Sequence, residues 1–398
     1  MSKLLLYICN YYPGQNGEGY RSFNQIKILK ELGYKIILVS LFPSSVSALP
    51  VENYVDEVFI IEKSILPPKL NSFSFLFKNI KTFLHNTFYF KSDLITSFKL
   101  KKHIYIKLQD LLQKLKKYNF NFVICRTPSV CYYAEKINLK IFFDLKAKIV
   151  YDMVDSLSRF IHSLRQQDFY KKLKILSYFY INMEKHLKNY DYITYITLAD
   201  AIHSGHKNSV FILPDIRKDF TSFKISKQRK IYDIILFGDW SYFPNKLGIT
   251  WFLKEIYPFL REKNIKVIIL GKGSENLKNI YKNEEIKFLG EVDTKNFKKF
   301  LLSSKISVSP VFIGAGYQNK VIDSLAFGIP TIAHKIFKNS DPLAPVLTFK
   351  DKKTLLKNID TLLKDKNLYE DLCRKSKDYY LKLKKKSYKD NLFFFENL

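Results

Sequence analysis

The stretch Phe312–Pro330 reads FIGAGYQNKVIDSLAFGIP and joins a glycine-rich turn to a short helix. Glycines let backbone amides approach a ligand closely, and the start of a helix adds unpaired N–H groups and a positive dipole. Lys320 adds a full positive charge, and Asp323, three residues later on the same face, can accept hydrogen bonds from ribose hydroxyls. The stretch therefore predicts a site for a nucleotide diphosphate, although an ordinary strand, turn and helix can carry the same glycine pattern.

On both sides of this stretch, short apolar runs alternate with helical patterns. Strands are expected at 3–9, 35–40, 57–61, 120–125, 147–152 and 191–196, and then at 232–237, 265–270, 286–289, 305–310 and 330–333. Helices are expected at 20–33, 73–90, 98–117 and 165–189, and then at 245–262, 294–303, 318–327 and from 352 onward. Such alternation indicates parallel βαβ units, so the predicted fold class is α/β with doubly wound, Rossmann-like sheets.

The length of 398 residues exceeds what one hydrophobic core usually serves, so two domains are expected. Residues 213–230 are polar, basic and weakly periodic, which makes them the best candidate for a linker. The predicted domains are accordingly 1–212 and 231–380.

In open parallel sheets, ligands bind beyond the carboxyl ends of the strands. The residues that follow the predicted strands are therefore the candidate site residues. In the second half they are Gly238, Asn245, Lys246, Gly271, Lys272, Gly314, Gly316, Tyr317, Gln318 and Asn319, and in the first half Gly17, Glu18, Arg21 and Asp155. Asp155 could orient a hydroxyl of an acceptor molecule, or it could cap a helix.

The charge of the chain is +29, from 66 Lys and Arg against 37 Asp and Glu. Such an excess favours an anionic partner, which could be nucleic acid, lipid or a phosphorylated substrate. Because the lysines are scattered through the whole chain, part of the excess could instead reflect codon bias or solubility. In the segment Lys69–Lys102, apolar residues recur at helical spacing among lysines, which fits either a helix on an anionic membrane surface or one packed on its own sheet. No nucleic-acid-binding signature is visible, so nucleic acid is not the expected partner.

Other classes lack their sequence signatures. The apolar runs are too short to span a membrane, and the first one fits a buried strand of a cytoplasmic protein better than a signal peptide. The four cysteines form no CxxC pair, and His203 and His206 have no further ligands nearby in sequence to complete a zinc site. Because there is no Asp-x-Asp motif either, we expect no metal and no cofactor.

The stretches Gly238–Phe252 and Gly314–Ala326 resemble the donor domain of family-4-type bacterial glycosyltransferases, in the branch with a Gly-Ala-Gly-x-Gln-Asn-Lys motif. Val150–Ser158 and Pro13–Arg21 resemble the acceptor domain of one bacterial branch. The resemblance covers essentially the whole chain. It implies the GT-B fold, in which two Rossmann-like domains face a central cleft, with residues 381–398 as a closing helix that crosses back to the first domain.

The resemblance also implies a function. A sugar would move, with retained configuration, from a nucleotide-sugar donor to a glycan or lipid-linked acceptor in bacterial surface polysaccharide synthesis, without metal. The location would be the cytoplasm or the inner face of the cytoplasmic membrane. A nucleotide-sugar epimerase, a noncatalytic GT-B relative and a basic nucleic-acid-binding protein remain the alternatives.

Site roles follow from the resemblance as well. Asp323 matches the position that holds the donor ribose, while Ala315 stands where the family usually has a glutamate that binds sugar hydroxyls. Lys320 and the backbone amides of Gly316–Asn319 would stabilise the leaving diphosphate. Lys320 and Asp155 are thus the predicted catalytic residues, and Gly17, Glu18 and Arg21 the predicted acceptor side.

Overall fold

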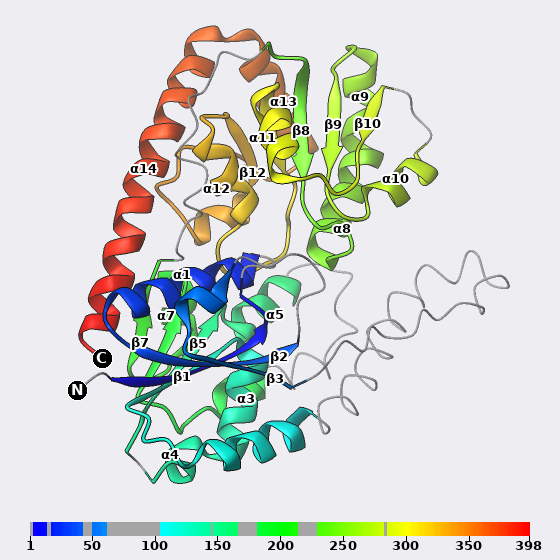
Figure 1. Ribbon diagram of the computed structural model, residues 1–398. Coiled ribbons are helices and arrows are strands. Elements are labelled where there is room, and N and C mark those ends of the chain that lie inside the picture. The colour runs from blue at the N-terminus through cyan, green and yellow to red at the C-terminus, as the bar shows by residue number, and fades with distance from the viewer. Residues whose placement is uncertain are drawn as a thin grey trace, which may run out of the picture.

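The computed structural model describes residues 3–13, 17–42, 50–61, 104–144, 146–165, 181–213, 229–281 and 285–398. These residues form two α/β units, one above the other, with a long helix running along both (Figure 1). The expected helix at 73–90, the whole basic segment Lys69–Lys102 and most of the expected linker lie outside the described residues.

The N-terminal sheet has seven parallel strands in the order β3-β2-β1-β4-β5-β6-β7. They are β1 Leu4–Tyr11, β2 Lys35–Phe42, β3 Glu57–Ile60, β4 Phe122–Arg126, β5 Lys148–Val154, β6 Tyr192–Tyr195 and β7 Ser209–Phe211. Its helices are α1 Gly17–Glu31, α3 Pro128–Ile137, α4 Leu139–Phe142, α5 Leu157–Arg165 and α7 Leu198–Ser204, with a 3₁₀ turn at Val51–Tyr54 and further helical residues at 104–115.

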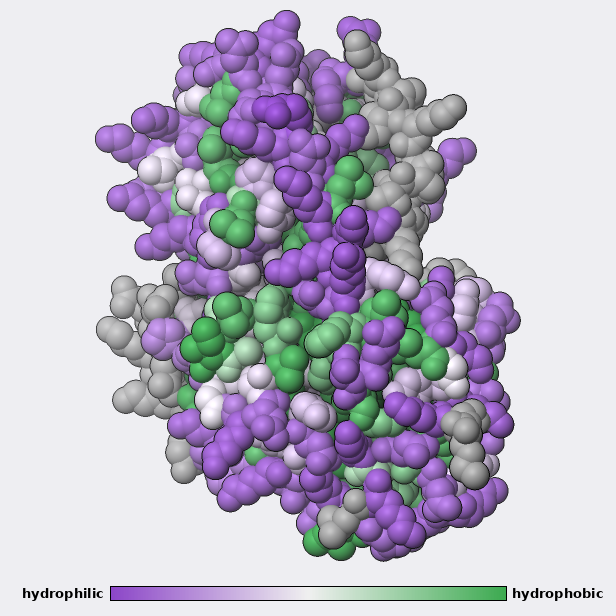
Figure 2. Space-filling view, turned by 90° about the vertical axis from the view of Figure 1, so that its left-hand side faces the viewer, coloured by the Kyte–Doolittle hydropathy of each residue, from purple (hydrophilic) through white to green (hydrophobic). Residues whose placement is uncertain are grey.

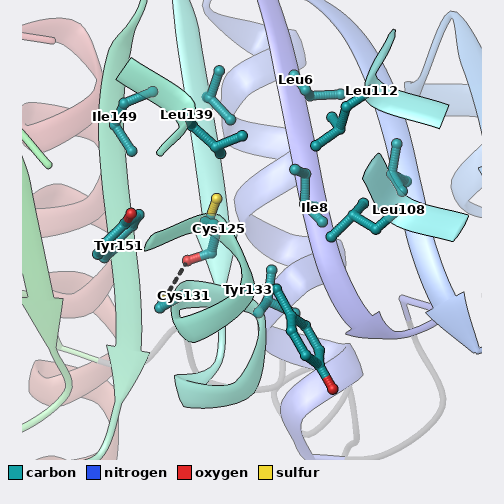
Figure 3. Packing of buried hydrophobic residues seen from close by; sticks show 14 of the residues in the cluster. Leu6, Ile8, Leu108, Leu112, Cys125, Cys131, Tyr133, Leu139, Ile149 and Tyr151 are labelled. Carbon is teal, nitrogen blue, oxygen red and sulfur yellow. Dashed lines mark hydrogen bonds between the residues drawn. The ribbon is translucent and has the colours of Figure 1, made fainter. Parts of the chain in front are cut away.

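The core of this domain lies on both faces of the central strands, as a parallel sheet requires. In Figure 3, Leu108 and Leu112 pack against Leu6 and Ile8 of β1. Nearby, the thiol of Cys131 donates a hydrogen bond to the carbonyl of Cys125 at 3.1 Å. The four cysteines are free thiols.

The C-terminal sheet has six parallel strands in the order β10-β9-β8-β11-β12-β13. They are β8 Tyr232–Phe237, β9 Val267–Leu270, β10 Ile286–Phe288, β11 Ser304–Ser309, β12 Thr331–His334 and β13 Leu347–Phe349. The helices are α8 Phe243–Trp251, α9 Tyr257–Glu262, α10 Ser274–Ile280, α11 Thr294–Leu302, α12 Asn319–Ala326 and α13 Lys352–Lys364, with a 3₁₀ turn at Lys335–Asn339.

The helix expected at 245–262 is not regular throughout. A π-helical turn at Phe252–Ile256 separates α8 from α9, which begins at Tyr257 and has Pro258 as its second residue. Proline has no N–H to donate and its ring crowds the preceding turn, so a wider turn at this point relieves both problems.

The last helix, α14 Lys366–Glu396, has 31 residues and spans both domains (Figure 1). The resemblance implied a closing helix at 381–398, and residues 381–396 form the last part of α14, which no glycine or proline interrupts. It begins beside α12 and α13 and ends against α1. There Tyr34 donates a hydrogen bond to the carbonyl of Phe395, and Lys148 donates one to the carbonyl of Leu398, at 3.2 and 2.7 Å.

Hydrophilic residues cover most of the face on which α14 lies, and hydrophobic ones gather on the N-terminal domain just below the junction of the domains (Figure 2). None of the helices that the structure describes combines the length and the apolar character that a membrane span requires.

Candidate functional site

The glycine-rich turn stands where the sequence predicted it, between β11 and α12. Gly316 has a φ of +69°, a left-handed conformation that favours glycine. Gln318 is the N-cap residue of α12, and its side-chain oxygen accepts a hydrogen bond from Ser309 at the end of β11, at 2.9 Å. The turn is therefore tied to the carboxyl end of its strand. The exposed Asn319 opens the helix, so its amide and that of Lys320 have no carbonyl one turn back within α12.

Lys320 meets residues from the loop after β8. Its ammonium donates a hydrogen bond to Asn245 Oδ1 at 2.6 Å and lies 5.7 Å from the centre of the Trp240 ring. A Cβ added to Gly238 would lie 3.2 Å from Lys320 Nζ. Burial lowers the pKa of Lys320 to about 7, and the charge of Asp239 offsets only part of that effect. An ammonium so poorly compensated favours an anionic ligand.

The loops after β8 and β9 are packed closely. Asn245 Nδ2 donates to the carbonyl of Asp239 at 2.8 Å, which fixes the amide that contacts Lys320. A Cβ at Gly271 would lie 2.1 Å from the carbonyl oxygen of Gly238, so only glycine fits there. The structure thus brings Gly238, Asn245, Gly271 and Lys320 together as predicted residues of one site, whereas the side chains of Lys246 and Lys272 are exposed.

The glycine turn also contacts the N-terminal domain. The amide of Gly314 donates to Ser163 Oγ of α5 at 3.1 Å, and the amide of Gly316 donates to Asp200 Oδ2 of α7 at 3.0 Å. Asp200 is fully buried and pairs with Arg159, whose Nη1 lies 2.9 Å from Asp200 Oδ1. Arg159 Nη2 also lies 3.5 Å from Ser340 Oγ of the C-terminal domain. The Gly316 amide, expected to face the diphosphate, is therefore bound to a carboxylate in this structure.

Asp155 reaches the same turn from the end of β5. Val154 has a φ of +66°, and the amide of Asp155 donates to the carbonyl of Met153 at 2.7 Å, which is the pattern of a tight γ-turn. A Cβ added to Gly316 would lie only 1.7 Å from Asp155 Oδ1, so the carboxylate abuts that glycine. Desolvation and the charge of Asp155 raise the pKa of Tyr242 to about 12.

Other residues cap α5, the helix that Asp155 precedes. Ser156 Oγ accepts from the amide of Arg159 at 3.2 Å, and Glu184 Oε2 accepts from the amide of Ser158 at 2.7 Å. The capping role that the sequence allowed for Asp155 is thus filled by Ser156 and Glu184.

Arg21, predicted on the acceptor side, is buried in a polar network beneath the end of β5. Asp152 Oδ2 lies 2.7 Å from Arg126 Nη1 and 3.1 Å from Gln25 Nε2, and Asp152 Oδ1 lies 3.4 Å from Arg21 Nη2. Burial alone would raise the pKa of Asp152, but the two arginines and Gln25 lower it to about 2. This ionised network supports the strand that carries Asp155. Gly17 and Glu18 are the first residues of α1.

Asp323, predicted to hold the ribose, lies on α12 one turn beyond Asn319 and is buried. Tyr317 connects the turn to α14. Burial and Asp341 raise the pKa of Tyr317, and Asp341 Oδ1 accepts a hydrogen bond from Tyr379 of α14 at 2.6 Å. The turn is thus linked both to the N-terminal domain and to the helix that spans the two domains.

Sequence reasoning missed Arg159 and Asp200, together with the buried Arg126 and Asp152. A signal existed for the last two, because a charged residue at the end of an otherwise apolar predicted strand needs a buried partner. Among the described residues, no group of three or more His, Cys, Asp or Glu side chains is placed to hold a metal ion.

Two parallel-sheet domains that face each other through such contacts define the GT-B fold, which solved structures confirm. Sucrose-phosphate synthase from Thermosynechococcus elongatus matches with a TM-score of 0.71 at 12% identity, over 99% of this chain and 98% of that one. Anabaena HepE, solved with UDP and glucose, matches with a TM-score of 0.62 at 10% identity, over 99% of both chains. WaaG, a glycosyltransferase of lipopolysaccharide biosynthesis, matches with a TM-score of 0.63 at 11% identity, over 97% and 98%.

Residues 232–365, which include β8 to α13, match the family model of the glycosyl transferases group 1. A search of curated protein sequences finds no match. The family match and the fold together support a glycosyltransferase of the GT-B type.

Proposed function

We propose that this protein transfers a sugar from a nucleotide-sugar donor to a glycan or lipid-linked acceptor, with retained anomeric configuration. The observation that carries the proposal is the Lys320 ammonium, which Asn245 holds at the start of α12 inside the matched domain. Neighbours of the same fold that were solved with UDP or UDP-glucose add support for a nucleoside diphosphate as the leaving group.

The chemistry follows from this arrangement. In the reaction the bond between the anomeric carbon and the β-phosphate oxygen breaks, and the acceptor oxygen bonds to the same carbon. The acceptor proton passes to the leaving diphosphate, so no separate base is needed. Negative charge develops on the diphosphate, where Lys320 and the amides of Asn319 and Lys320 stabilise it. Asp323 holds the ribose, and the lysine charge replaces a metal ion.

The N-terminal domain supplies the acceptor side. The start of α1 at Gly17 and Glu18 follows the carboxyl end of β1, and Asp155 is one of the two carboxylates that this domain places against the glycine turn. Arg21 acts indirectly, through Asp152 and β5. The resemblance to a bacterial branch favours an envelope or surface glycan as product, made in the cytoplasm or on the inner face of the membrane.

Thermal-shift titration with UDP, GDP, CDP and CMP tests the donor site. One nucleotide should raise the melting temperature, and Lys320→Met should weaken its binding about 10- to 100-fold, the usual effect of losing charged hydrogen bonds. Lys254→Met removes an exposed lysine of the same domain and should leave binding unchanged.

Incubation with nucleotide sugars then separates the functions that the sequence left open. Slow donor hydrolysis supports transfer, and formation of an epimer supports a nucleotide-sugar epimerase. Failure to bind any nucleotide, together with tight oligonucleotide binding, would overturn the proposal.

A further inference from the structure

The glycine turn has no carboxylate of its own to bind a sugar. Gly314, Ala315 and Gly316 have no polar side chain, and the side-chain oxygen of Gln318 accepts from Ser309. Sugar hydroxyls are hydrogen-bond donors, and a carboxylate is the strongest acceptor that a protein offers them. A hydrogen-bond acceptor for the hydroxyls of a sugar at this turn must therefore come from another part of the protein.

Two carboxylates of the N-terminal domain touch the turn, and they differ in role. Asp200 is fully buried, accepts from the Gly316 amide and pairs with Arg159, so its charge is balanced and its position is structural. Asp155 is half-buried and abuts the Cα of the same glycine, next to Ala315.

The backbone that presents Asp155 is strained. A β-branched residue with positive φ, such as Val154 at +66°, is a rare outlier that costs free energy. Such a conformation persists where the surrounding structure enforces it, and it is common at sites that hold a ligand. The bulge in the pairing of β5 with β6 falls at the same place, between Asp152 and Val154.

The position of Asp155 indicates which part of the donor it would contact. In a donor whose diphosphate lies at the start of α12, the sugar is joined to the β-phosphate and so lies close to the turn that immediately precedes this helix. Asp155 is a half-buried side chain of the facing domain at that turn. A neutral sugar presents only hydroxyl donors to it, whereas a uronic acid adds a carboxylate that the charge of Asp155 repels.

We propose that Asp155 binds hydroxyl groups of the donor sugar and makes the protein selective for neutral sugars over uronic acids. The facing domain thus supplies the carboxylate that the turn lacks at Ala315. This inference rests on the proposed function, because it requires a nucleotide-sugar donor.

The test compares the affinities of UDP, UDP-glucose and UDP-glucuronate for the wild type and Asp155→Asn, or of GDP, GDP-mannose and GDP-mannuronate if the base is guanine. The wild type should prefer the neutral sugar. Asp155→Asn should bind the bare nucleoside diphosphate as before, bind the neutral nucleotide sugar about 10- to 100-fold more weakly, and lose most of the discrimination. Asp110→Asn, which changes an exposed carboxylate of the same domain, should change none of these values.

A second variant tests the position of the carboxylate. Adding Ala315→Glu to Asp155→Asn should restore part of the affinity for the neutral sugar, because it returns a carboxylate to the same place from the other side. If the wild type binds nucleotide sugars and Asp155→Asn keeps both the wild-type affinity for the neutral sugar and the wild-type preference for it over the uronic acid, the inference is overturned and the proposed function stands. If the wild type binds no nucleotide sugar, both the inference and the proposed function are overturned.

Discussion

The amide of Gly316 donates a hydrogen bond across the two domains to Asp200 Oδ2, at 3.0 Å. Asp200 is at the same time the ionic partner of Arg159, which also reaches Ser340 of the C-terminal domain. The geometry of the glycine turn, and with it the start of α12, therefore depends on the facing domain. This contact links the donor site to the relative position of the domains.

Asp200→Ala should destabilise the protein. It leaves the Arg159 guanidinium and the Gly316 amide without their buried acceptor, and breaking a buried ion pair from one side costs about 3 kcal/mol. Urea titration should show this loss in the free energy of unfolding. Asp200→Asn keeps an acceptor oxygen and should lose less, and Asp144→Asn, at an exposed site, should lose nothing measurable. A stability of Asp200→Ala equal to the wild type would refute the structural role.

Gly316→Ala should disrupt the same contact sterically. Its new methyl group would lie 1.7 Å from Asp155 Oδ1, on a residue whose φ is +69°. The left-handed backbone alone costs roughly 1–2 kcal/mol for a residue with a side chain, and displacement of Asp155 adds to it. Melting temperature and nucleotide affinity should both fall.

Gly314→Ala is the matched control, because no atom lies within 4 Å of a Cβ at that position. Its stability should stay within about 0.5 kcal/mol of the wild type. Equal effects of the two substitutions would mean that the close contact of Asp155 with Gly316 does not exist in solution.

Long buried strands can be recognised in the sequence, whereas very short strands cannot. The strand β8 lies at its predicted residues because a strand buried on both faces of a parallel sheet reads as an unbroken apolar run. The strands β7 and β13 have three residues each, too few for any periodicity, and were not predicted.

The candidate site likewise contains residues that the sequence could predict and residues that it could not. Gly238, Asn245 and Lys320 could be predicted because each lies in or just after a loop that follows a recognisable strand. Arg159 and Asp200 could not, because in the sequence they look like an ordinary surface arginine and the acidic first turn of a helix. Their roles arise only from the way in which the two domains meet.

Donor affinity should depend on pH through Lys320. The pKa of this lysine is about 7 in the free protein, and a bound diphosphate favours the protonated form. Affinity for a nucleotide sugar should therefore be constant at low pH and fall by up to about tenfold per unit as pH rises above 7. Lys320→Arg, which stays charged throughout, should bind without this fall between pH 7 and 9. A wild-type profile as flat as that of the arginine variant would contradict the assignment.

Lys320 should also reduce the stability of the free protein. Because its pKa is lowered on folding, the unfolded chain binds more protons than the folded one between pH 7 and the ordinary lysine pKa of about 10.4. Stability should consequently rise with pH in that window. Lys320→Met removes the buried charge and should raise the melting temperature at pH 7 while it weakens donor binding. A lower melting temperature would show that the ammonium is well compensated in the free protein.

The end of α14 should stabilise the N-terminal domain. Phe395 is 2% exposed and packs among residues of β1, β2 and α1, whereas Phe393, two positions earlier on the same helix, is 70% exposed. Phe395→Ala should lower the free energy of unfolding by about 3–5 kcal/mol, because it removes a large buried side chain and leaves a cavity. Phe393→Ala should change it by less than about 0.5 kcal/mol. Deletion of 387–398 should destabilise the protein at least as much as Phe395→Ala, and a truncated protein with unchanged melting temperature and activity would show that α14 does not hold the two domains together.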